Sequence, residues 1–506
     1  MEKIVPTRWI RGGRLLRHGQ GGWQLEASDV RVDGDRIAAI VARDLAAPRN
    51  PVDIDGSGRI IIPGLVNAHL HSNDDFLRGR IDKLPLEVYM LMAVPPTGVF
   101  DIKPEDIEIR TLLGAIEGLK TGTTSFLDDC YHIDRLRPES IDAVMRGYER
   151  IGARAWVTAN LSDRPISDTI PFVNDYLDDS VRQELNSVDR LPAPIALQYC
   201  EDAIRRYNSA DQPRVRMAMA ASGPQRCTDK FLEAIWEVVE RHAVPCVSHV
   251  LETRIQGITG EVFYGETLIR HMARLGCLTP RTVIAHGIWV TDADIAQIAE
   301  AGSSVVHNPT SNLRLGSGVA PVGKMLRAGI NVALGSDGMT SNDAQNIFLE
   351  MRLAGCIHNI KGQAFDQWVG ANEAFTMGTE GGAAALGASQ ELGQVEVGML
   401  ADLCLLNIES AAYVPLNEPV QNIVFSEYGQ SVSTVLVGGE IVVDEGRVVT
   451  VSESEIYGLA REAASRFFTD NREAFARLRE FTPAFERAYA RAALVDYPTN
   501  RWIPGE

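Results

Sequence analysis

The middle of the chain alternates between short apolar runs and longer amphipathic stretches, and this alternation restricts the fold more than any other feature. Amphipathic stretches such as residues 105–120, 229–242, 292–301 and 319–328 have the apolar spacing of helices that cover a sheet with one face. Eight repeats of a strand and a helix predict an α/β protein built as a (β/α)8 TIM-like barrel. The apolar runs expected as its strands are residues 60–67, 124–128, 154–159, 214–221, 245–250, 281–285, 303–307 and 331–335.

The segments on both sides of the barrel region have a different texture. Residues 1–62 and 386–450 contain short β-like runs separated by turns rich in Gly and Asp, so we expect them to form one small composite β-sandwich. The barrel is then expected over residues 63–385. Residues 451–506 have a charged helical pattern and are expected as a tail that packs against the barrel or a second subunit. The interval 161–213 is long for one βα unit and predicts a helical insertion or an active-site loop.

Composition places the 506-residue chain among ordinary globular proteins, with 45% hydrophobic and 23% charged residues. The net charge of −18 argues against nucleic acid or an anionic membrane as a partner. No apolar run has the length of a membrane span, and the first residues do not resemble a secretory signal. The seven cysteines lack a C-x-x-C pair, which argues against disulfides or a thiolate zinc site and favours a cytoplasmic protein.

Histidines and one aspartate stand where the expected strands end. His69 and His71 form an H-x-H pair, and alternation along a strand places both side chains on one face. His249, His286 and Asp337 close three later strands, at the edge where barrel enzymes assemble their sites. The set His69, His71, His249 and Asp337 suits zinc or iron(II) with one position open for water. The alternative is that each histidine is separately a hydrogen-bonded polar group near a loop.

Several stretches resemble the amidohydrolase superfamily, in the branch that contains triazine hydrolases, adenosylhomocysteine and guanine deaminases, and cytosine deaminase. The matching stretches, in the family's order, are PGLVNAHLH, GTTSFLD, SHVLET, IAHGIWVTDADI, HNPTSNLRLGSGVAPV and GSDGMTSND. The later GQVEVGMLADLCLLN resembles the family's return into its small β-sandwich. The resemblance covers nearly the whole chain except the tail, and the motifs together are far more specific than any one of them.

The resemblance implies a role for each of these side chains. The four-residue donor set would hold one divalent metal, with zinc expected ahead of iron(II), and metal-bound hydroxide would attack the substrate. Asp337 would accept a proton from the attacking water, and His286 would orient the nucleophile or stabilise the oxyanion. Binuclear members use a carboxylated lysine on strand four. The run 214–221 contains no lysine, so one metal per chain is expected.

Glu252 follows His249 as H-x-x-E in the stretch SHVLET. From the residues alone, a surface glutamate at a helix start, favoured by the helix dipole, is as good an interpretation as a catalytic one. The resemblance to deaminases favours the catalytic role, in which Glu252 protonates a ring nitrogen and then the leaving amine.

The substrate pocket is expected to include residues that follow other strands. Gln225, His307 and Asn308 are expected to shape it, and His132 either lines its mouth or has a structural role. The loops that would decide the substrate are residues 72–100, 129–137 and 161–213.

The predicted function is that of an aminohydrolase (deaminase) that releases ammonia from an aminated heterocycle. One alternative is a hydrolase of the same family that removes halide or alkylamine or opens a cyclic amide, but amine departure needs an acid such as Glu252. A non-enzymatic scaffold is a second alternative, against which the intact donor set argues. The expected partner is a small heterocyclic substrate, and the resemblance to the family implies further copies of this chain, in a homodimer or larger homo-oligomer.

The loop after the fourth expected strand bears on which heterocycles are accepted. Relatives that deaminate adenine nucleosides have a stretch resembling G-P-H-A-P-Y there, and Gln225 in SGPQRC stands at the position of its histidine. A glutamine amide has no titratable ring and cannot reproduce an imidazole's contact. We therefore expect poor activity on adenosine, methylthioadenosine and adenosylhomocysteine relative to a free base or a non-nucleoside ring.

Overall fold

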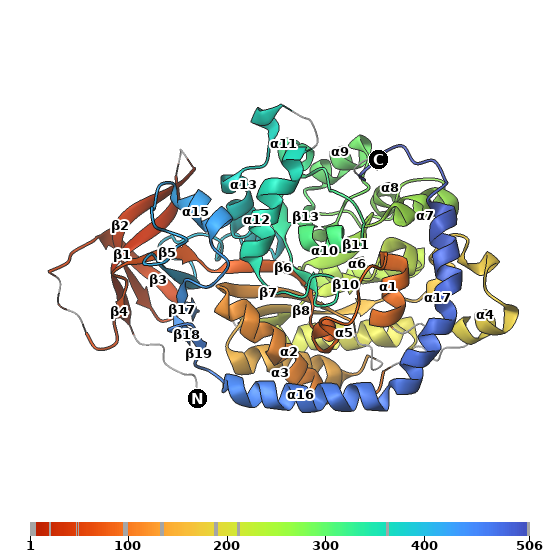
Figure 1. Ribbon diagram of the computed structural model, residues 1–506, viewed down its shortest axis with the longest axis horizontal. Coiled ribbons are helices and arrows are strands. Elements are labelled where there is room, and N and C mark those ends of the chain that lie inside the picture. The colour runs from red at the N-terminus through yellow and green to blue at the C-terminus, as the bar shows by residue number, and fades with distance from the viewer. Residues whose placement is uncertain are drawn as a thin grey trace.

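Two β-sheets organise the chain, a curled parallel sheet in the middle and a mixed sheet at one end (Figure 1). Helices surround the parallel sheet, and two long C-terminal helices run along the outside of the molecule (Figure 1). The computed structural model describes residues 7–19, 22–46, 48, 50–94, 100–131, 136–186, 191–209, 213–360 and 364–502.

The parallel sheet is the predicted barrel. Its strands are β6 (Leu65–His71), β7 (Thr123–Cys130), β8 (Arg154–Leu161), β9 (Val215–Met217), β10 (Met219–Ala221), β11 (Cys246–Val250), β12 (Thr282–His286), β13 (Ser304–His307), β14 (Val332–Leu334) and β15 (Asp337–Gly338). Two of the eight positions are split, the fourth into β9 and β10 and the eighth into β14 and β15. Because β14 pairs with β13 and β15 pairs with β6, the eighth position joins the last strands to the first. The predicted TIM-like fold is confirmed.

The helices that cover the barrel begin and end with residues suited to those positions. Thr228 caps α6 with its side chain, and Thr291 and Asp294 form a capping box at the start of α9. Gly302 ends α9 in the left-handed conformation, with φ 67°. The helices before the tail are α1 (Leu86–Ala93), α2 (Pro104–Lys120), α3 (Pro138–Ile151), α4 (Asp179–Asn186), α5 (Ala193–Tyr207), α6 (Asp229–His242), α7 (Arg254–Tyr264), α8 (Leu268–Arg274), α9 (Asp292–Ala301), α10 (Pro309–Arg314), α11 (Val322–Arg327), α12 (Ile347–Ile357), α13 (Ala371–Met377), α14 (Glu380–Ala385) and α15 (Pro419–Ser426).

The long interval after β8 is helical in its described part. It contains α4 and α5, preceded by two short 3-10 turns, η2 (Ile166–Asp168) and η3 (Val173–Asp175). Of the two alternatives that its length left open, the structure therefore shows a helical insertion. Other 3-10 turns are η1 (Ser72–Leu77), η4 (Pro224–Arg226), η5 (His358–Ile360) and η6 (Phe365–Gln367).

The first predicted strand, residues 60–67, is two strands in the structure. β5 (Arg59–Pro63) belongs to the mixed sheet and β6 to the barrel, with Gly64 between them. A Cβ atom on Gly64 would lie 2.2 Å from Thr124 Oγ1, so only glycine lets the chain pass this close to the barrel. The run is apolar on both sides of the crossing, which is why its pattern does not reveal the change of sheet.

The mixed sheet combines strands from both ends of the chain. β5 pairs antiparallel with β16, and this pairing joins the N-terminal strands to the C-terminal ones. Buried apolar side chains such as Ile10, Val30 and Leu403 form a core separate from that of the barrel. Its strands are β1 (Arg8–Gly19), β2 (Gly22–Asp33), β3 (Arg36–Ala42), β4 (Ile54–Asp55), β5, β16 (Leu403–Asn407), β17 (Val432–Val437), β18 (Glu440–Asp444) and β19 (Arg447–Val448).

A buried ion pair links the barrel to the mixed sheet. Arg154, the first residue of β8, donates from Nε and Nη2 to the two carboxylate oxygens of Asp402, at 2.8 and 2.9 Å. Both side chains are at most 3% exposed. Asp402 Oδ1 also accepts from the backbone N–H of Gly438 at 2.7 Å, so the carboxylate connects three segments.

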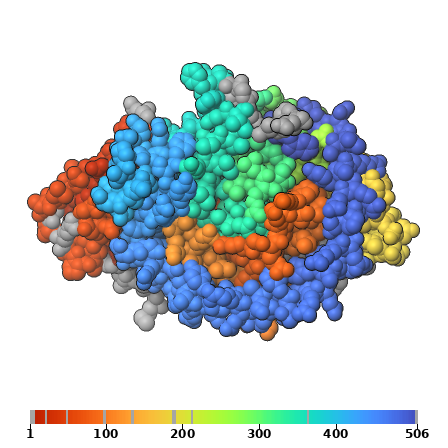
Figure 2. Space-filling view, in the orientation of Figure 1, coloured from red at the N-terminus to blue at the C-terminus, as the bar shows by residue number. Residues whose placement is uncertain are grey.

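The C-terminal tail consists of α16 (Glu453–Asp470) and α17 (Arg472–Ala492). α16 packs against α2, where Lys120 Nζ lies 2.7 Å from Glu453 Oε2, and α17 packs against α1 and α7. Figure 2 shows the tail bordering the surface formed by the segment that contains α1. Among the residues described, no helix is long and apolar enough to cross a lipid bilayer.

Replacement of Arg154 by alanine is expected to destabilise the protein by about 3–5 kcal/mol, because it leaves the Asp402 carboxylate buried without its partner. Urea unfolding followed by circular dichroism measures the loss. Arg146→Ala is the matched control, since Arg146 is 47% exposed in its pair with Glu108 and should contribute about 1 kcal/mol or less. Equal unfolding midpoints for the two variants would show that the buried Arg154–Asp402 pair stabilises the fold no more than an exposed pair does.

Candidate metal centre and its cavity

Five side chains from the strand ends meet at one end of the barrel. His69 and His71 lie on β6, His249 on β11, His286 at the last residue of β12 and Asp337 at the first residue of β15. None of the five is more than 7% exposed. The ring centroid of His69 lies 4.7 Å from that of His71 and 4.9 Å from that of His249. The sequence pattern placed these residues at separate strand ends, and the structure brings all five together.

Backbone carbonyl groups determine how two of the rings are turned. His71 Nδ1 lies 2.6 Å from the carbonyl oxygen of Asp129, and His249 Nδ1 lies 3.0 Å from that of Ser222. A carbonyl oxygen can only accept, so in the neutral rings each Nδ1 carries the hydrogen and each Nε2 lone pair faces the centre. The two Nε2 atoms are 3.2 Å apart. Asp337 Oδ1 lies 3.3 Å from His71 Nε2.

The charges of the site are set by burial and by Asp337. Burial lowers the pKa of His69 and His249 well below the ordinary value, so both rings are neutral. Burial acts in the same direction on His71, but the hydrogen bond and charge of Asp337 outweigh it and raise the pKa of His71 to about 10. The site thus balances the buried carboxylate of Asp337 with positive charge, which a proton on His71 or a divalent metal ion can supply.

The donor chemistry fits a divalent metal. Both ring nitrogens of His69 are buried and have no hydrogen-bond partner among the described residues. An unpaired buried polar group costs about 1–3 kcal/mol, so this ring points to a partner that the protein itself does not supply. Ligand atoms of His69, His71 and Asp337 lie within 4.8 Å of one another, and the same holds for His69, His249 and His286. Imidazole nitrogens with one carboxylate are suitable zinc ligands.

Two residues of the site have left-handed backbone conformations. His286 has φ 73° and Asp337 has φ 62°, a region that costs a non-glycine residue about 1–3 kcal/mol. Asn312 Oδ1 lies 2.9 Å from His286 Nδ1, and Asn308 Nδ2 lies 3.2 Å from the same atom. The ring is therefore held with its Nε2 toward Glu252 Oε2, at 3.6 Å, and Asp337 Oδ2, at 3.7 Å.

Glu252 is buried in the site. It lies before α7 with an exposed fraction of only 3%, and its backbone N–H donates to Gln256 Oε1 at 3.0 Å. Burial raises the pKa of its carboxyl group to about 7. The interpretation of this residue as a surface glutamate at a helix start is therefore wrong, and the group can exchange a proton near neutral pH.

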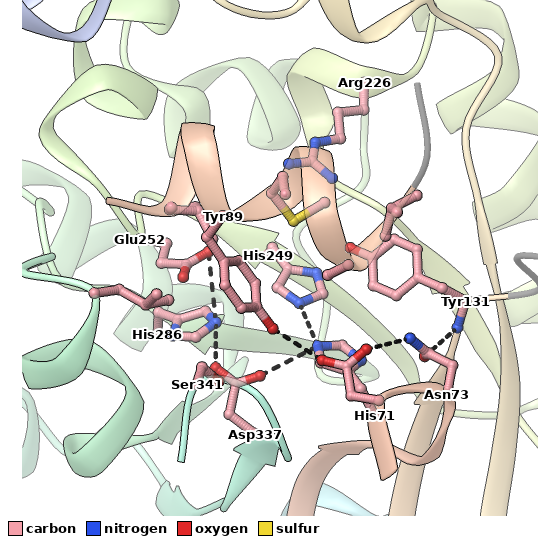
Figure 3. A pocket seen from close by; sticks show the side chains of 16 residues that line it. His71, Asn73, Tyr89, Tyr131, Arg226, His249, Glu252, His286, Asp337 and Ser341 are labelled. Carbon is pink, nitrogen blue, oxygen red and sulfur yellow. Dashed lines mark hydrogen bonds and ion pairs between the residues drawn. The ribbon is translucent and has the colours of Figure 1, made fainter. Parts of the chain in front are cut away.

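A cavity opens over these residues (Figure 3). The Tyr89 and Tyr131 rings lie on the two sides of His249 in the view of Figure 3. The described residues that line the cavity are His71, Asn73, Asp74, Leu86, Tyr89, Met90, Ala93, Val94, Tyr131, Arg226, His249, Glu252, His286, Leu315, Asp337 and Ser341.

Two of the four residues predicted for the pocket, Gln225 and Asn308, lie close to this cavity. Gln225 lines a small adjoining cavity, which shares the side chains of Leu86, Met90 and Arg226 with the main one. Asn308 contacts the ring nitrogen Nδ1 of His286, as described above.

Two histidines remain from the predicted pocket. His307 Nε2 lies 3.2 Å from His358 Nε2, and His307 is not among the described residues that line the main cavity. His132 lies outside the residues that the structure describes.

Several cavity residues had no role in the sequence analysis. Tyr89 comes from α1, and its hydroxyl donates to Asp74 Oδ2 at 2.8 Å. Tyr131 directly follows β7 and Arg226 lies on η4 after β10, so proximity to a strand end could have identified both. No such signal marks the side chains of α1, because their place depends on how the first long loop folds back over the barrel.

The chain was compared with known proteins. It matches the Amidohydrolase family over residues 60–442. A 5-methylthioadenosine/S-adenosylhomocysteine deaminase of Acetivibrio thermocellus is 34% identical over 414 residues, which are 82% of this chain and 88% of the relative. A 5'-deoxyadenosine deaminase of Methanothermobacter thermautotrophicus is 30% identical over 456 residues, covering 90% of this chain and 97% of the relative.

A solved structure is similar over almost the same length. The adenosine deaminase of Xanthomonas campestris with bound zinc has a TM-score of 0.77 and 25% sequence identity, covering 92% of this chain and 99% of that one. The resemblance predicted from the strand-end motifs is confirmed. By its sequence match, its relatives and its barrel, the chain belongs to the amidohydrolase family.

Proposed function

We propose that this amidohydrolase is a metal-dependent deaminase that releases ammonia from an aminated heterocycle. The observation that carries the proposal is the buried Glu252 carboxyl group, which lines the cavity 3.6 Å from His286 and has a pKa raised by burial to about 7. An amine must be protonated before it departs, whereas halide needs no acid. The names of the two relatives reported above, a 5-methylthioadenosine/S-adenosylhomocysteine deaminase and a 5'-deoxyadenosine deaminase, support the same reaction.

We further propose that His69, His71, His249 and Asp337 hold one metal ion, with zinc expected. A bound divalent metal would supply activated water at neutral pH, because it lowers the pKa of the bound water to about 7. The unpaired nitrogens of His69 support this assignment. The absence of lysine from residues 214–221 supports one metal per chain. A cytoplasmic location and a homo-oligomeric state remain predictions from the sequence.

The chain's own residues would move the protons of the reaction. Hydrolytic deamination forms a C–O bond and breaks a C–N bond; as the water oxygen becomes a ring oxo group, its two protons pass to a ring nitrogen and to the leaving amine. We assign the removal of a proton from the water to Asp337, and the protonation of the ring nitrogen and then of the leaving amine to Glu252, which lies across His286 from it. His286, held by Asn312 and Asn308, is positioned to stabilise the oxygen on which negative charge develops.

Removal of one ligand is expected to remove the metal. His69→Ala should purify with far less than one zinc per chain and lose ammonia release, since the fully buried ring nitrogens have no hydrogen-bond partner among the described residues. Elemental analysis measures the metal, and circular dichroism checks that the fold persists. His242→Ala is the control, because His242 pairs with Glu201 away from the cavity. Stoichiometric zinc with near-normal turnover in His69→Ala would refute the site.

Glu252→Gln separates proton transfer from metal binding. The amide has nearly the same shape but cannot relay a proton, so we expect normal zinc content, a near-normal KM and a loss in kcat on the order of 10² or more. Glu261→Gln, on the exposed face of α7, is the control and should keep wild-type turnover. Wild-type kcat in Glu252→Gln on an amine-leaving substrate would remove the basis of the deaminase proposal.

Adenine nucleosides are expected to be poor substrates, because the sequence resemblance places Gln225 at the position of a histidine in nucleoside deaminases. Loss of one buried contact costs about 1–3 kcal/mol, a factor of roughly 5 to 150 in kcat/KM. Ammonia release from adenosine, methylthioadenosine and adenosylhomocysteine is to be compared with release from free purines, pterins, pyrimidines and triazines. A clear preference for any of the three nucleosides would show the expectation to be wrong.

A further inference from the structure

Arg226 is the cavity residue that the proposed reaction does not use. Among the described residues that line the main cavity, it alone carries a permanent positive charge. It is the last residue of η4, directly after β10, and its side chain is partly buried. Figure 3 shows it at the opposite end of the view from His71 and Asp337.

The guanidinium group of Arg226 has unused hydrogen-bonding capacity. Its Nη1 donates to Ser222 Oγ at 3.2 Å, and a guanidinium carries five N–H donors in all. Within the described ranges, no carboxylate forms an ion pair with it. The charge of Arg226 also acts on two buried acids, Glu252 and Glu87. Burial raises the pKa of each carboxyl group, and the positive charge of Arg226 opposes that effect. The cation is therefore available to a ligand in the cavity.

The backbone of Arg226 is fixed on both sides. Its N–H donates to the carbonyl oxygen of Gly223 at 2.9 Å. Its own carbonyl accepts from the N–H groups of Asp163 and Arg164, at 3.3 and 3.2 Å. These bonds tie the loop after β10 to the loop after β8, so the base of the side chain is positioned before any ligand binds. A group held in this way loses less conformational entropy on binding.

The remaining walls of the cavity suit a flat ring. Tyr131 has its ring centroid 5.2 Å from that of His71 and 6.1 Å from that of His249, and Tyr89 faces the cavity from α1. Leu86, Met90, Ala93, Val94 and Leu315 complete the apolar lining. These aromatic and apolar side chains can contact the faces of a planar heterocycle.

We propose that Arg226 binds an oxygen acceptor on the substrate, a ring oxo group or a carboxylate, and so selects aminated heterocycles that carry one. The inference rests on the proposed deaminase function, because it assumes that the amine is directed to Glu252 and His286. An arginine fork donates parallel N–H bonds to such an oxygen, and a hydrogen bond from a charged donor is about twice as strong as a neutral one. A heterocycle without the oxygen leaves these donors unpaired.

Two matched pairs of probes test the proposal. Guanine and 2-aminopurine differ by a ring oxo oxygen, and 2-aminopyrimidine-4-carboxylate and 2-aminopyrimidine differ by a carboxylate. Ammonia release is measured with zinc-loaded wild type, Arg226→Met and the control Lys230→Met, which removes an exposed cation from α6. In wild type, at least one pair should favour the oxygen-bearing member in kcat/KM. That ratio should fall about 10- to 100-fold in Arg226→Met, with zinc content retained, and stay at the wild-type value in Lys230→Met.

Binding without turnover separates this proposal from the proposed function. Dissociation constants for the same four compounds are measured in a Glu252→Gln background, with and without Arg226→Met. If ammonia is released but the ratios of kcat/KM do not depend on Arg226, the role of Arg226 is refuted and the deaminase proposal stands. If no ammonia is released but binding of an oxygen-bearing member weakens in Arg226→Met, the deaminase proposal fails and the role of Arg226 stands. If neither turnover nor binding depends on Arg226, the proposal is overturned.

Discussion

The rest of the structure depends on bringing three imidazoles and a carboxylate to one buried point. Each of these groups loses its hydration there, since none is more than 7% exposed. Burial alone disfavours every charged form, and only opposite charge at the centre compensates for it. A parallel barrel solves the problem because its strands end at one rim, so residues far apart in the chain converge with little freedom. The carbonyl oxygens that orient His71 and His249 come from the same rim.

Strain at the rim is held by polar contacts between neighbouring loops. Asp337 has a left-handed backbone, and the loop after it is tied down by Asn342, whose Nδ2 donates to the Ser336 carbonyl at 2.7 Å. The same nitrogen donates to the buried Glu350 at 2.8 Å, which also accepts from Thr310 Oγ1 at 2.7 Å. Glu350 thus joins the loops after the seventh and eighth barrel positions. Such surroundings allow a strained residue to persist where its side chain must point inward.

How far the sequence predicts this molecule depends on whether a feature is local. Strand ends such as His249 and His286 follow directly from apolar runs that stop at a polar residue, and the family motifs confirm the fold around them. Gly64 shows one limit of prediction from the sequence. The apolar run around it passes from one sheet to the other without a change in composition. Tyr89 shows a second limit. Its place over the cavity is set by contacts of α1 with distant segments, and no spacing in the sequence encodes those contacts.

One turn connects the proton donor, the cavity wall and the tail. Glu252 faces the site, while Thr253 Oγ1 donates to Glu87 Oε1 on α1 at 2.5 Å. Arg254 Nη1 donates to the carbonyl oxygen of Ala492 at 2.9 Å, at the C-terminal end of α17, where a cation also complements the helix dipole. The family match ends at residue 442, so the tail lies outside it. Consecutive residues of a turn cannot move independently, so the contacts of Thr253 and Arg254 also support the position of Glu252. In this chain one of those contacts comes from the C-terminal tail, which the family match does not include.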